Sequence, residues 1–133
     1  MKRRTFVRLA TVTTAALYFP NLHCRAIDSA MARVLSRPVE LQHICDAKTI
    51  HDIGLAYQHQ VAGETGKSTL INLLAVDSNN QPIDERADSG LVASLVAKKV
   101  QQDFDQNKTI VVDGWVLSVT EARQCALFSL IEN

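Results

Sequence analysis

The sequence predicts a mainly α-helical domain of four to five helices with one short β-hairpin near residues 109–118. Apolar residues recur every three or four positions in two long segments, near 47–61 and 89–106, and this spacing places them on one face of a helix. The pattern then changes to a β-branched run followed by Asp113-Gly114, a pair typical of a tight hairpin turn. A helical pattern that is apolar on most sides returns near residue 120, as expected of a buried helix.

The first residues of the chain have the pattern of a twin-arginine export signal. Arg3, Arg4 and Phe6 match its arginine pair and the aromatic residue that follows, and a mildly apolar stretch occupies residues 9–19. We therefore expect a signal peptide at 1–26 that sends an already folded domain to the periplasm. The alternative is a leader for the general secretory route that happens to contain two arginines.

The end of this leader is marked by small residues. Cys24-Arg25-Ala26 fits a cleavage point after Ala26, which leaves one small helical domain at 27–133. Cys24 is also a conceivable lipid-attachment site. His23 stands where such sites have a small residue, so the match is poor.

Charge is divided unevenly between the leader and the domain. The leader holds five of the 14 basic residues and none of the 14 acidic ones, so the domain carries a net charge of about −5. An acidic domain without a basic stripe is poorly suited to nucleic acid, because neutralisation of phosphates supplies most of that affinity. No stretch after the leader reaches the ~18 apolar residues of a membrane-spanning helix, so no integral membrane segment is expected after signal removal.

Three shorter helices are expected before the long one. Pro38 fits the first turn of a helix that runs to about Cys45, because its missing N–H costs nothing there. Asp46 can cap the next helix. The apolar stripe of that helix consists of Ile50, Ile53, Tyr57 and Val61. A polar turn at 62–68 precedes a compact apolar run at 70–76, which we interpret as a short buried helix.

The clearest helix spans about 89–106, with Asp88 or Ser89 as its cap. Asn107 suits the left-handed residue that often ends a helix. The apolar side of this helix is expected to contain Leu91, Val92, Leu95, Val96, Val100 and Phe104.

The hairpin and the final helix share a boundary. Ser118 and Glu121 have the spacing of a capping box, and Thr120 is a rival cap. The final helix should therefore start near 120 and run to the end of the chain. Because a two-stranded hairpin is barely stable alone in water, it must lie against the helices or against another chain.

Residues 63–69, Gly-Glu-Thr-Gly-Lys-Ser-Thr, end in the Gly-Lys-Ser of a phosphate-binding loop. Such a loop needs four residues between its first Gly and the Gly-Lys pair, which puts the first Gly where Val61 stands. A helical pattern, rather than a strand, also precedes the segment. We therefore interpret it as a polar loop and predict no cofactor-binding residue here.

The histidines of the domain, His43, His51 and His59, are eight residues apart, which rotates a helix by about 80°. They therefore do not share a helix face, whereas the His pairs of helical metal sites lie three or four apart. The alternative to surface or partly packed histidines is a metal site in which Cys45 joins His43, with Asp52 or Asp46 as a further ligand. No metal ligand is predicted. No Ser/His/Asp or Cys/His set is arranged locally, so no catalytic residue is predicted either.

Two cysteines remain after removal of the leader, Cys45 and Cys125. An even pair in an oxidising compartment permits one disulfide. The alternative is two small hydrophobic side chains on the apolar faces of their helices.

The leader and the end of the chain resemble a known family of small exported proteins. The resemblance is carried by Arg3-Arg4-Thr5-Phe6, by Trp115, and by Thr120-Glu121-Ala122-Arg123-Gln124-Cys125-Ala126-Leu127-Phe128. These segments resemble the gluconate 2-dehydrogenase subunit 3 family, and the small subunits of periplasmic sorbitol and fructose dehydrogenases are similar in plan. The resemblance implies a short helical protein that pairs with a large flavin-carrying oxidoreductase and has no active site of its own.

The resemblance also implies a division of roles. This chain would be a non-catalytic accessory subunit that escorts a larger exported sugar or alcohol dehydrogenase and helps it mature. FAD would be bound by the partner subunit and no cofactor by this chain. Trp115, Glu121, Arg123 and Phe128 are the residues we expect at the partner interface.

Two other functions remain open at this point. One is a stand-alone periplasmic binding or structural module with no partner enzyme, which would use residues 43–59 or the loop at 63–69. The other is an enzyme in its own right, for which no titratable cluster in the sequence argues.

Overall fold

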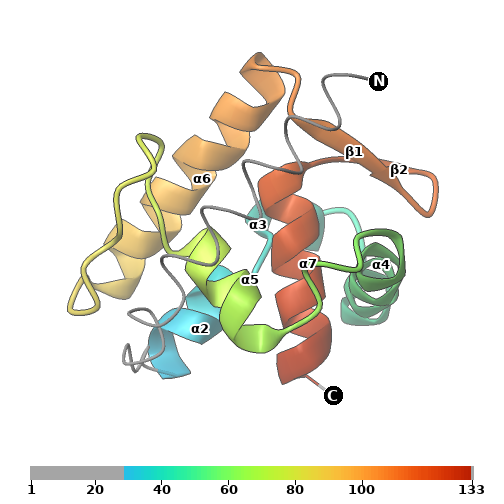
Figure 1. The fold of residues 1–133 in the computed structure, drawn as a ribbon, viewed down its shortest axis with the longest axis horizontal. Helices are drawn as coiled ribbons and strands as arrows, with labels where there is room; N and C mark the ends of the chain where they lie inside the picture. Colours follow the sequence, from blue (N-terminus) through green and yellow to red (C-terminus); the bar gives the residue numbers. More distant parts are fainter. Residues whose placement is uncertain (1–28, 133) are drawn as a thin grey trace.

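The computed structural model describes residues 29–132 (Figure 1). The predicted signal residues Arg3, Arg4 and Phe6, together with Cys24, lie outside the described residues. The prediction of a mainly α-helical domain with one hairpin is confirmed, although the described part of the chain contains six helices rather than the four to five expected. The elements are α2 (Ser29–Leu35), α3 (Val39–Gln42), α4 (Ala47–Gln60), α5 (Lys67–Leu74), α6 (Ser89–Asp105), β1 (Thr109–Val112), β2 (Trp115–Ser118) and α7 (Val119–Ile131).

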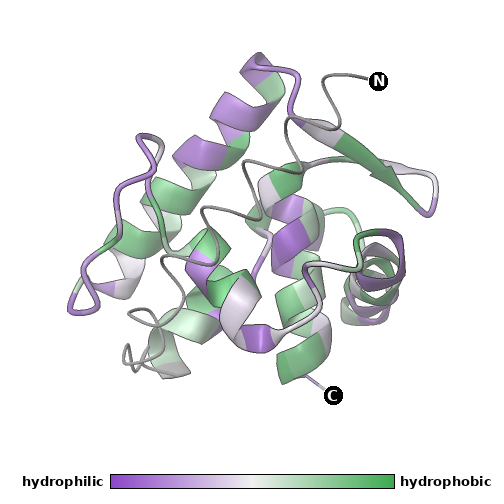
Figure 2. Cartoon of the chain, in the orientation of Figure 1, coloured by the Kyte–Doolittle hydropathy of each residue, from purple (hydrophilic) through white to green (hydrophobic). Residues whose placement is uncertain are grey.

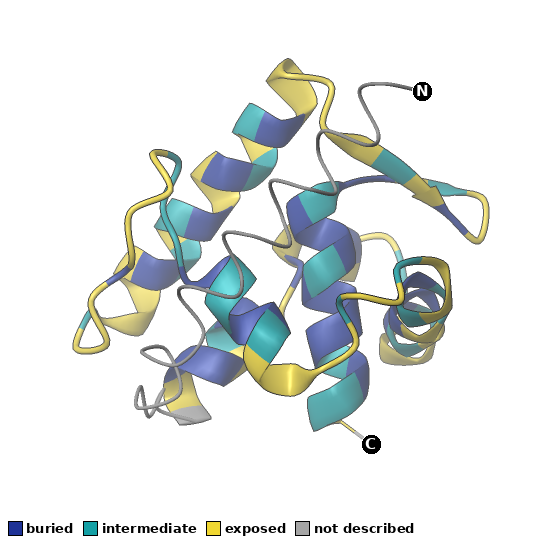
Figure 3. Cartoon of the chain, in the orientation of Figure 1, coloured by how far each residue is buried: buried dark blue, intermediate teal, exposed yellow. Residues whose placement is uncertain are grey.

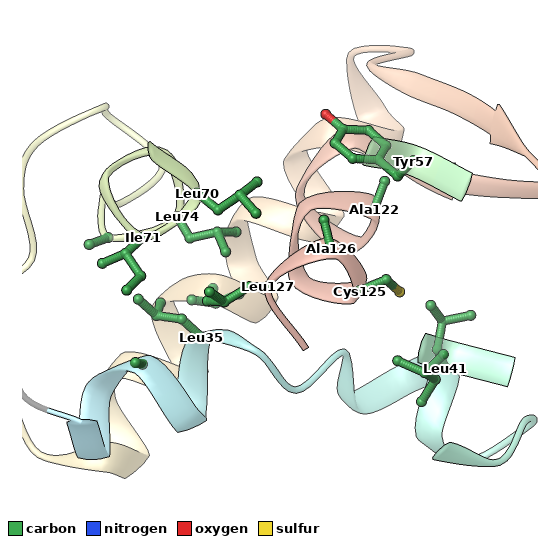
Figure 4. Close-up of a cluster of buried hydrophobic side chains, with 14 of the residues drawn as sticks. Leu35, Leu41, Tyr57, Leu70, Ile71, Leu74, Ala122, Cys125, Ala126 and Leu127 are labelled. Atoms are coloured by element: carbon green, nitrogen blue, oxygen red, sulfur yellow. The ribbon is translucent and has the colours of Figure 1, made fainter. Parts of the chain in front are cut away.

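Helix α7 forms the centre of the fold. It packs against α2, α4, α5, α6 and both strands, and nearly all of its residues are buried or half-buried (Figures 1 and 3). Leucine side chains from α2 and α5 point toward Leu127 of α7 (Figure 4). The prediction that the final helix is apolar on most sides because it is buried therefore holds. None of the helices described is both long and apolar enough to cross a bilayer.

The contact between α4 and α7 is unusually close at Gly54. A Cβ atom placed there would lie 2.1 Å from the backbone oxygen of Cys125, well inside van der Waals contact. Ala122 and Ala126 continue the row of small residues on α7, and both are completely buried. One turn further along α4, Gln58 Nε2 donates to Ser129 Oγ at 2.6 Å. The two helices therefore pack almost backbone to backbone.

The hairpin has the register and turn that its sequence predicts. Asp113 and Gly114 have φ values of 51° and 83°, the left-handed pair of a type I′ turn. Val112 and Leu117 are buried against the helices, whereas Val111 and Val116 lie directly opposite each other and face outward. The strands contact α4, α6 and α7, so the hairpin rests on the helices of its own chain.

The predicted helix caps are also observed. Asp46 accepts the Thr49 N–H at 2.8 Å at the start of α4. Ser118 Oγ accepts the Glu121 N–H at 2.9 Å while Glu121 Oε1 accepts the Ser118 N–H at 3.1 Å, which completes the capping box. Asn107 has a φ of 57° after the end of α6.

Two expectations about the helices were wrong in detail. The helix predicted at 38–45 covers only Val39–Gln42, because the N–H groups of Ile44 and Cys45 both turn back to the Leu41 carbonyl. The chain then leads directly into the Asp46 cap of α4.

The buried face of α6 also differs from the apolar face expected from the sequence. It consists of Val92, Val96, Lys99 and Asp103, while Leu91 and Phe104 remain 50% and 41% exposed. Lys99 and Asp103 continue this buried face because α5 and α7 provide polar partners for them. The side of α6 that faces the core is therefore not the most apolar side of the helix.

We expect Gly54→Ala to lower the free energy of unfolding by at least ~2 kcal/mol, because the added methyl group forces α4 away from α7. Helix propensity alone would favour Ala over Gly by ~1 kcal/mol. A loss of stability in this variant would therefore be due to the close packing of α4 against α7. Gly63→Ala is the matched control, since no atom lies within 4 Å of its added Cβ. Chemical denaturation of both variants measures the difference, and equal stability of the two would contradict the close packing.

Candidate functional site

The surface between α3 and α6 contains a groove of about 910 Å³, with the first two turns of α7 at its base. Helix α6 lines it along most of its length, from Ser89 to Phe104, which corresponds to about 22 Å at 1.5 Å per residue. The residues on this face of α6 recur at helical spacing, with Ala93 and Ser94 adjacent, and are small at one end and large at the other: Gly90, Ala93, Ser94, Ala97, Val100 and Phe104. The groove is thus long, lined by small side chains toward the start of α6 and apolar toward Phe104.

Two carboxylates face this groove. Glu40 is exposed on α3, whereas Glu121 is only 5% exposed at the start of α7. Burial raises the pKa of Glu121, and the negative charges of Glu40 and Asp103 raise it further. Arg37 is the one basic residue among those described that lines the groove, and its backbone carbonyl accepts a hydrogen bond from Gln124 Nε2 at 3.1 Å. The base of the groove is therefore polar and mainly acidic.

A second polar cluster joins α4, α7 and the loop between α4 and α5. Arg123 donates from Nε to Glu64 Oε1 at 2.7 Å and from Nη2 to Glu64 Oε2 at 3.2 Å. Tyr57 also donates its hydroxyl proton to Glu64 Oε1 at 2.8 Å. The side chains of Arg123 and Glu64 are only 21% and 20% exposed, so this forked ion pair is substantially protected from solvent.

The protonation states in this cluster favour a structural role. Burial alone would raise the pKa of Glu64, but the hydrogen bonds and charge of Arg123 outweigh it and the pKa is lowered. Burial and the hydrogen bond to Glu64 raise the pKa of Tyr57 well above its ordinary value, so the phenol keeps its proton. Every member is thus held in the form that bonds to the others, and none is poised to exchange a proton near neutral pH.

A third polar set ties α6 to α5 and α7. Asp103 Oδ2 accepts from the backbone N–H and the hydroxyl of Thr120, at 2.9 and 2.6 Å. Lys99 Nζ donates to the Leu73 carbonyl at 3.3 Å, near the end of α5. Burial lowers the pKa of Lys99, and the positive charge of Arg123 acts in the same direction. Asp103 therefore acts as a second cap of α7, supplied from another helix.

The residues expected at a partner interface take different places in the structure. Trp115 and Phe128 are half-buried and pack against the core. Glu121 belongs to the capping box and Arg123 to the ion pair with Glu64. None of the four is fully exposed, so their role toward a partner stays a prediction. Glu121 is the one that also lines the groove.

The other candidate residues do not form a site in the described part. His51 and His59 lie on α4 and His43 just after α3, and no three His, Cys, Asp or Glu side chains among residues 29–132 gather closely enough to hold a metal ion. Of the segment 63–69, which was predicted to be a polar loop, only residues 63–66 lie between α4 and α5. Lys67, Ser68 and Thr69 form the first turn of α5, and Gly66 caps this helix without a side-chain bond.

The two cysteines of the described part have free thiols in this structure. Cys125 is completely buried in α7, and Cys45 is half-buried with its thiol donating to the Leu41 carbonyl at 3.2 Å. Burial raises the pKa of both thiols. A disulfide between them stays a prediction.

Several of these residues were missed in the sequence. Lys99 and Asp103 continue the helical spacing of Val92 and Val96. This spacing of a charged pair behind two valines could have predicted that both charges face the core. Glu64 gave no such signal, because its partner is 59 residues away in the chain.

We expect Glu64→Gln to lower the free energy of unfolding by ~1–3 kcal/mol at pH 7, because it leaves Arg123 half-buried without its counter-ion. The lowered pKa of Glu64 means that its carboxylate stabilises the fold above the ordinary value of 4.5 and that this contribution disappears as the pH falls through the lower folded value. The variant should therefore lose less stability on acidification than the parent. Asp52→Asn breaks the exposed pair with Lys48 and serves as the control, with stability close to that of the parent. Urea titrations at several pH values measure both, and an unchanged acid dependence in Glu64→Gln would refute the assignment.

Glu121→Gln should keep the capping box, because an amide oxygen can still accept the Ser118 N–H. The raised pKa of Glu121 means that its ionisation opposes folding as the pH rises above 4.5. The variant should therefore be at least as stable as the parent at pH 7, whereas Ser118→Ala should cost ~1 kcal/mol through loss of the cap. A clear loss of stability in Glu121→Gln at pH 7, seen by denaturation, would show that the charge is needed for the fold.

Comparison with known proteins gives no relative for this fold or for these sites. No protein-family model matches the chain, and no match is found among curated proteins or solved structures. The family resemblance seen in the leader and the last helix therefore stays a hypothesis, and the function has to be argued from the surfaces described above.

Proposed function

We propose that this chain is a non-catalytic accessory subunit that is exported by the twin-arginine route together with a larger flavin-dependent sugar or alcohol dehydrogenase. In this proposal the large subunit binds FAD and carries out the chemistry. This chain contributes an apolar contact surface that keeps the pair together during export and maturation. The family resemblance suggests the type of partner, and the hairpin of this chain supplies the physical argument for a partner.

The observation that carries the proposal is an exposed apolar pair on the outer face of the hairpin. Val111 and Val116 lie directly opposite each other and are 58% and 63% exposed. In Figure 2 much of both strands has the colour of hydrophobic residues, and in Figure 3 part of the hairpin has the colour of exposed residues. A directly opposed pair forms one continuous apolar patch, which costs free energy in water unless something covers it.

The edges of this two-stranded sheet strengthen the argument. Strand β1 pairs only with β2 within the described residues, so each strand has one edge without a strand partner. Such edges readily accept another strand or loop. Gln60 Nε2 already bonds the Val111 carbonyl at 3.0 Å, which holds β1 against α4. An incoming chain would therefore meet a hairpin that is already fixed in position.

The polar clusters of the chain are compatible with a role without chemistry of its own. Glu64, Arg123 and Tyr57 bond to one another, and Asp103 bonds to the start of α7. Each of these groups is used to hold the fold. Nothing in these contacts needs a substrate, whereas the hairpin face gains stability from a protein that covers it.

The test replaces the apolar pair and follows the complex. The double variant Val111→Thr and Val116→Thr keeps the β-branched shape and should fold normally, but it should weaken association with the dehydrogenase by roughly tenfold or more, since two buried apolar contacts are lost. Affinity isolation of the tagged chain from its native host, with the FAD absorbance of the eluate as readout, measures this association.

Leu91→Gln is the control, because Leu91 is an apolar side chain of comparable exposure, 50%, at the end of α6 that is far from the hairpin in the sequence. It should leave the yield of flavoprotein unchanged. Isolation of the parent chain as a monomer without any flavoprotein would refute the proposal, and so would an equal yield with the hairpin variant.

A further inference from the structure

We propose that the groove between α3 and α6 receives an amphipathic helix of the partner protein, and that this helix carries a Lys or Arg directed at Glu40 and Glu121. This inference rests on the proposed function, because it presumes a partner, but it concerns a surface separate from the hairpin pair. It names the kind of element that the partner presents and the charge that it carries.

The shape of the groove favours a polypeptide segment over a small molecule. It extends for about 22 Å along α6, the length of roughly four helical turns. Compact ligands are usually enclosed on most sides, whereas this groove is elongated and bordered by two helices. An amphipathic helix that lies along α6 would match its length and would pack in the manner of helix-in-groove recognition.

The residues of α6 suit a closely packed helix. Gly90, Ala93, Ser94 and Ala97 form a row of small side chains at helical spacing, so a neighbouring helix can approach its backbone closely. The larger Phe104 is 41% exposed at one end of this row. The partner helix would therefore lie closest to α6 near its start and bury its own apolar residues against Phe104 near its end.

The opposite wall of the groove adds apolar contact. Val39 on α3 is 49% exposed, although α3 itself is held in place by the buried Leu41. Val34 lines the same side from α2. An incoming apolar stripe would thus be in contact with valines on one side and with α6 on the other.

Charge specifies the polar part of the incoming helix. Among residues 29–132, the charged residues that line the groove are Arg37, Glu40 and Glu121, and the negative charge of Glu40 is near enough to raise the pKa of Glu121. Glu121 is buried and already bonds the Ser118 N–H through Oε1, so it cannot turn away from the groove to reach solvent. A Lys or Arg on the partner would neutralise this site, whereas an acidic residue there would be repelled.

A second copy of this chain is less suitable as the occupant. Helices α4, α5 and α7 direct apolar faces into the chain's own core: α4 through Ile50 and Ile53, α5 through Leu70 and Leu74, and α7 on most sides. Inserting any of these three into another copy would expose that core. Helix α6, the longest of the helices in residues 29–132, could pack against the α6 of another copy, but the residues with which it lines the groove include no Lys or Arg to pair with Glu40 and Glu121. The occupant is therefore expected from a different protein.

The experiment places a photo-reactive benzoylphenylalanine at Ala97 of the full chain in its native host, with Ala62 as the matched exposed position outside the groove. Irradiation at position 97 should yield a cross-link to the co-isolated flavoprotein. Mass spectrometry should map it to a helical segment with apolar residues every three or four positions and a Lys or Arg among them. Position 62 should give no cross-link to that segment.

Charge variants provide the second measurement. Glu40→Arg should lower the cross-link yield from position 97 by roughly tenfold, because it repels the basic residue of the partner helix. Glu132→Arg changes an exposed acid at the end of α7 and should leave the yield unchanged. Circular dichroism of each variant checks that it is folded.

The outcomes separate the two proposals. Co-isolation of the flavoprotein without a cross-link from position 97 would overturn the groove assignment alone. Cross-links to a second copy, to residues 1–28 of the same chain, or to a segment without a basic residue would overturn it as well. Failure of the parent chain to co-isolate any flavoprotein would overturn the proposed function and this inference together.

Discussion

The close approach of α4 to α7 at Gly54 is the constraint on which the rest of the structure depends. Because no side chain separates the two backbones there, α7 can be enclosed by α4 on one side and by α2, α5 and α6 on the others. A domain of this length can bury only one modest core, so a central helix covered all round makes efficient use of few apolar residues. The small residues of α7, Ala122 and Ala126, act in the same way: they reduce the distance between elements rather than add apolar volume.

Because α7 is enclosed, the backbone N–H groups at its N-terminus, which lack partners within the helix, need hydrogen-bond acceptors from elsewhere. Two residues supply such acceptors. Ser118 belongs to the hairpin strand that leads into the helix, and Asp103 comes from α6, 17 residues earlier. The first turn of α7 is thereby bonded to β2 and to α6 at once. Glu121, which completes the capping box, lies on this turn, so the base of the groove is as firmly placed as the core itself.

Sequence patterns could predict those features that a few neighbouring residues decide. The type I′ turn at Asp113-Gly114, the Asp46 cap and the capping box of α7 all depend on contacts within four residues, and each is observed. The inner face of α6 and the ion pair of Glu64 depend on groups 17 to 59 residues away, and no local pattern reports those. A groove is harder still to predict from the sequence, because it depends on the space that remains between two packed helices. Its lining residues on α6 combine small and polar side chains with Val96, Val100 and Phe104, which the sequence pattern assigns to the apolar side of the helix, so no single face of α6 marks the groove in the sequence.

The arrangement of α7 also bears on how a partner could be bound tightly by so small a chain. The hairpin and the groove are separate surfaces, yet both are anchored to the same turn, the hairpin through Ser118 and the groove through Glu121. A partner that covered both would meet two surfaces already fixed relative to each other, so little conformational entropy would be lost on binding. Two small binding surfaces that are fixed relative to each other act as one larger interface. Once the partner has bound one of them, it meets the other at a high effective concentration. In the proposed complex, the burial of α7 on all sides would serve binding as well as stability, because it would hold both proposed contact surfaces in place before the partner arrives.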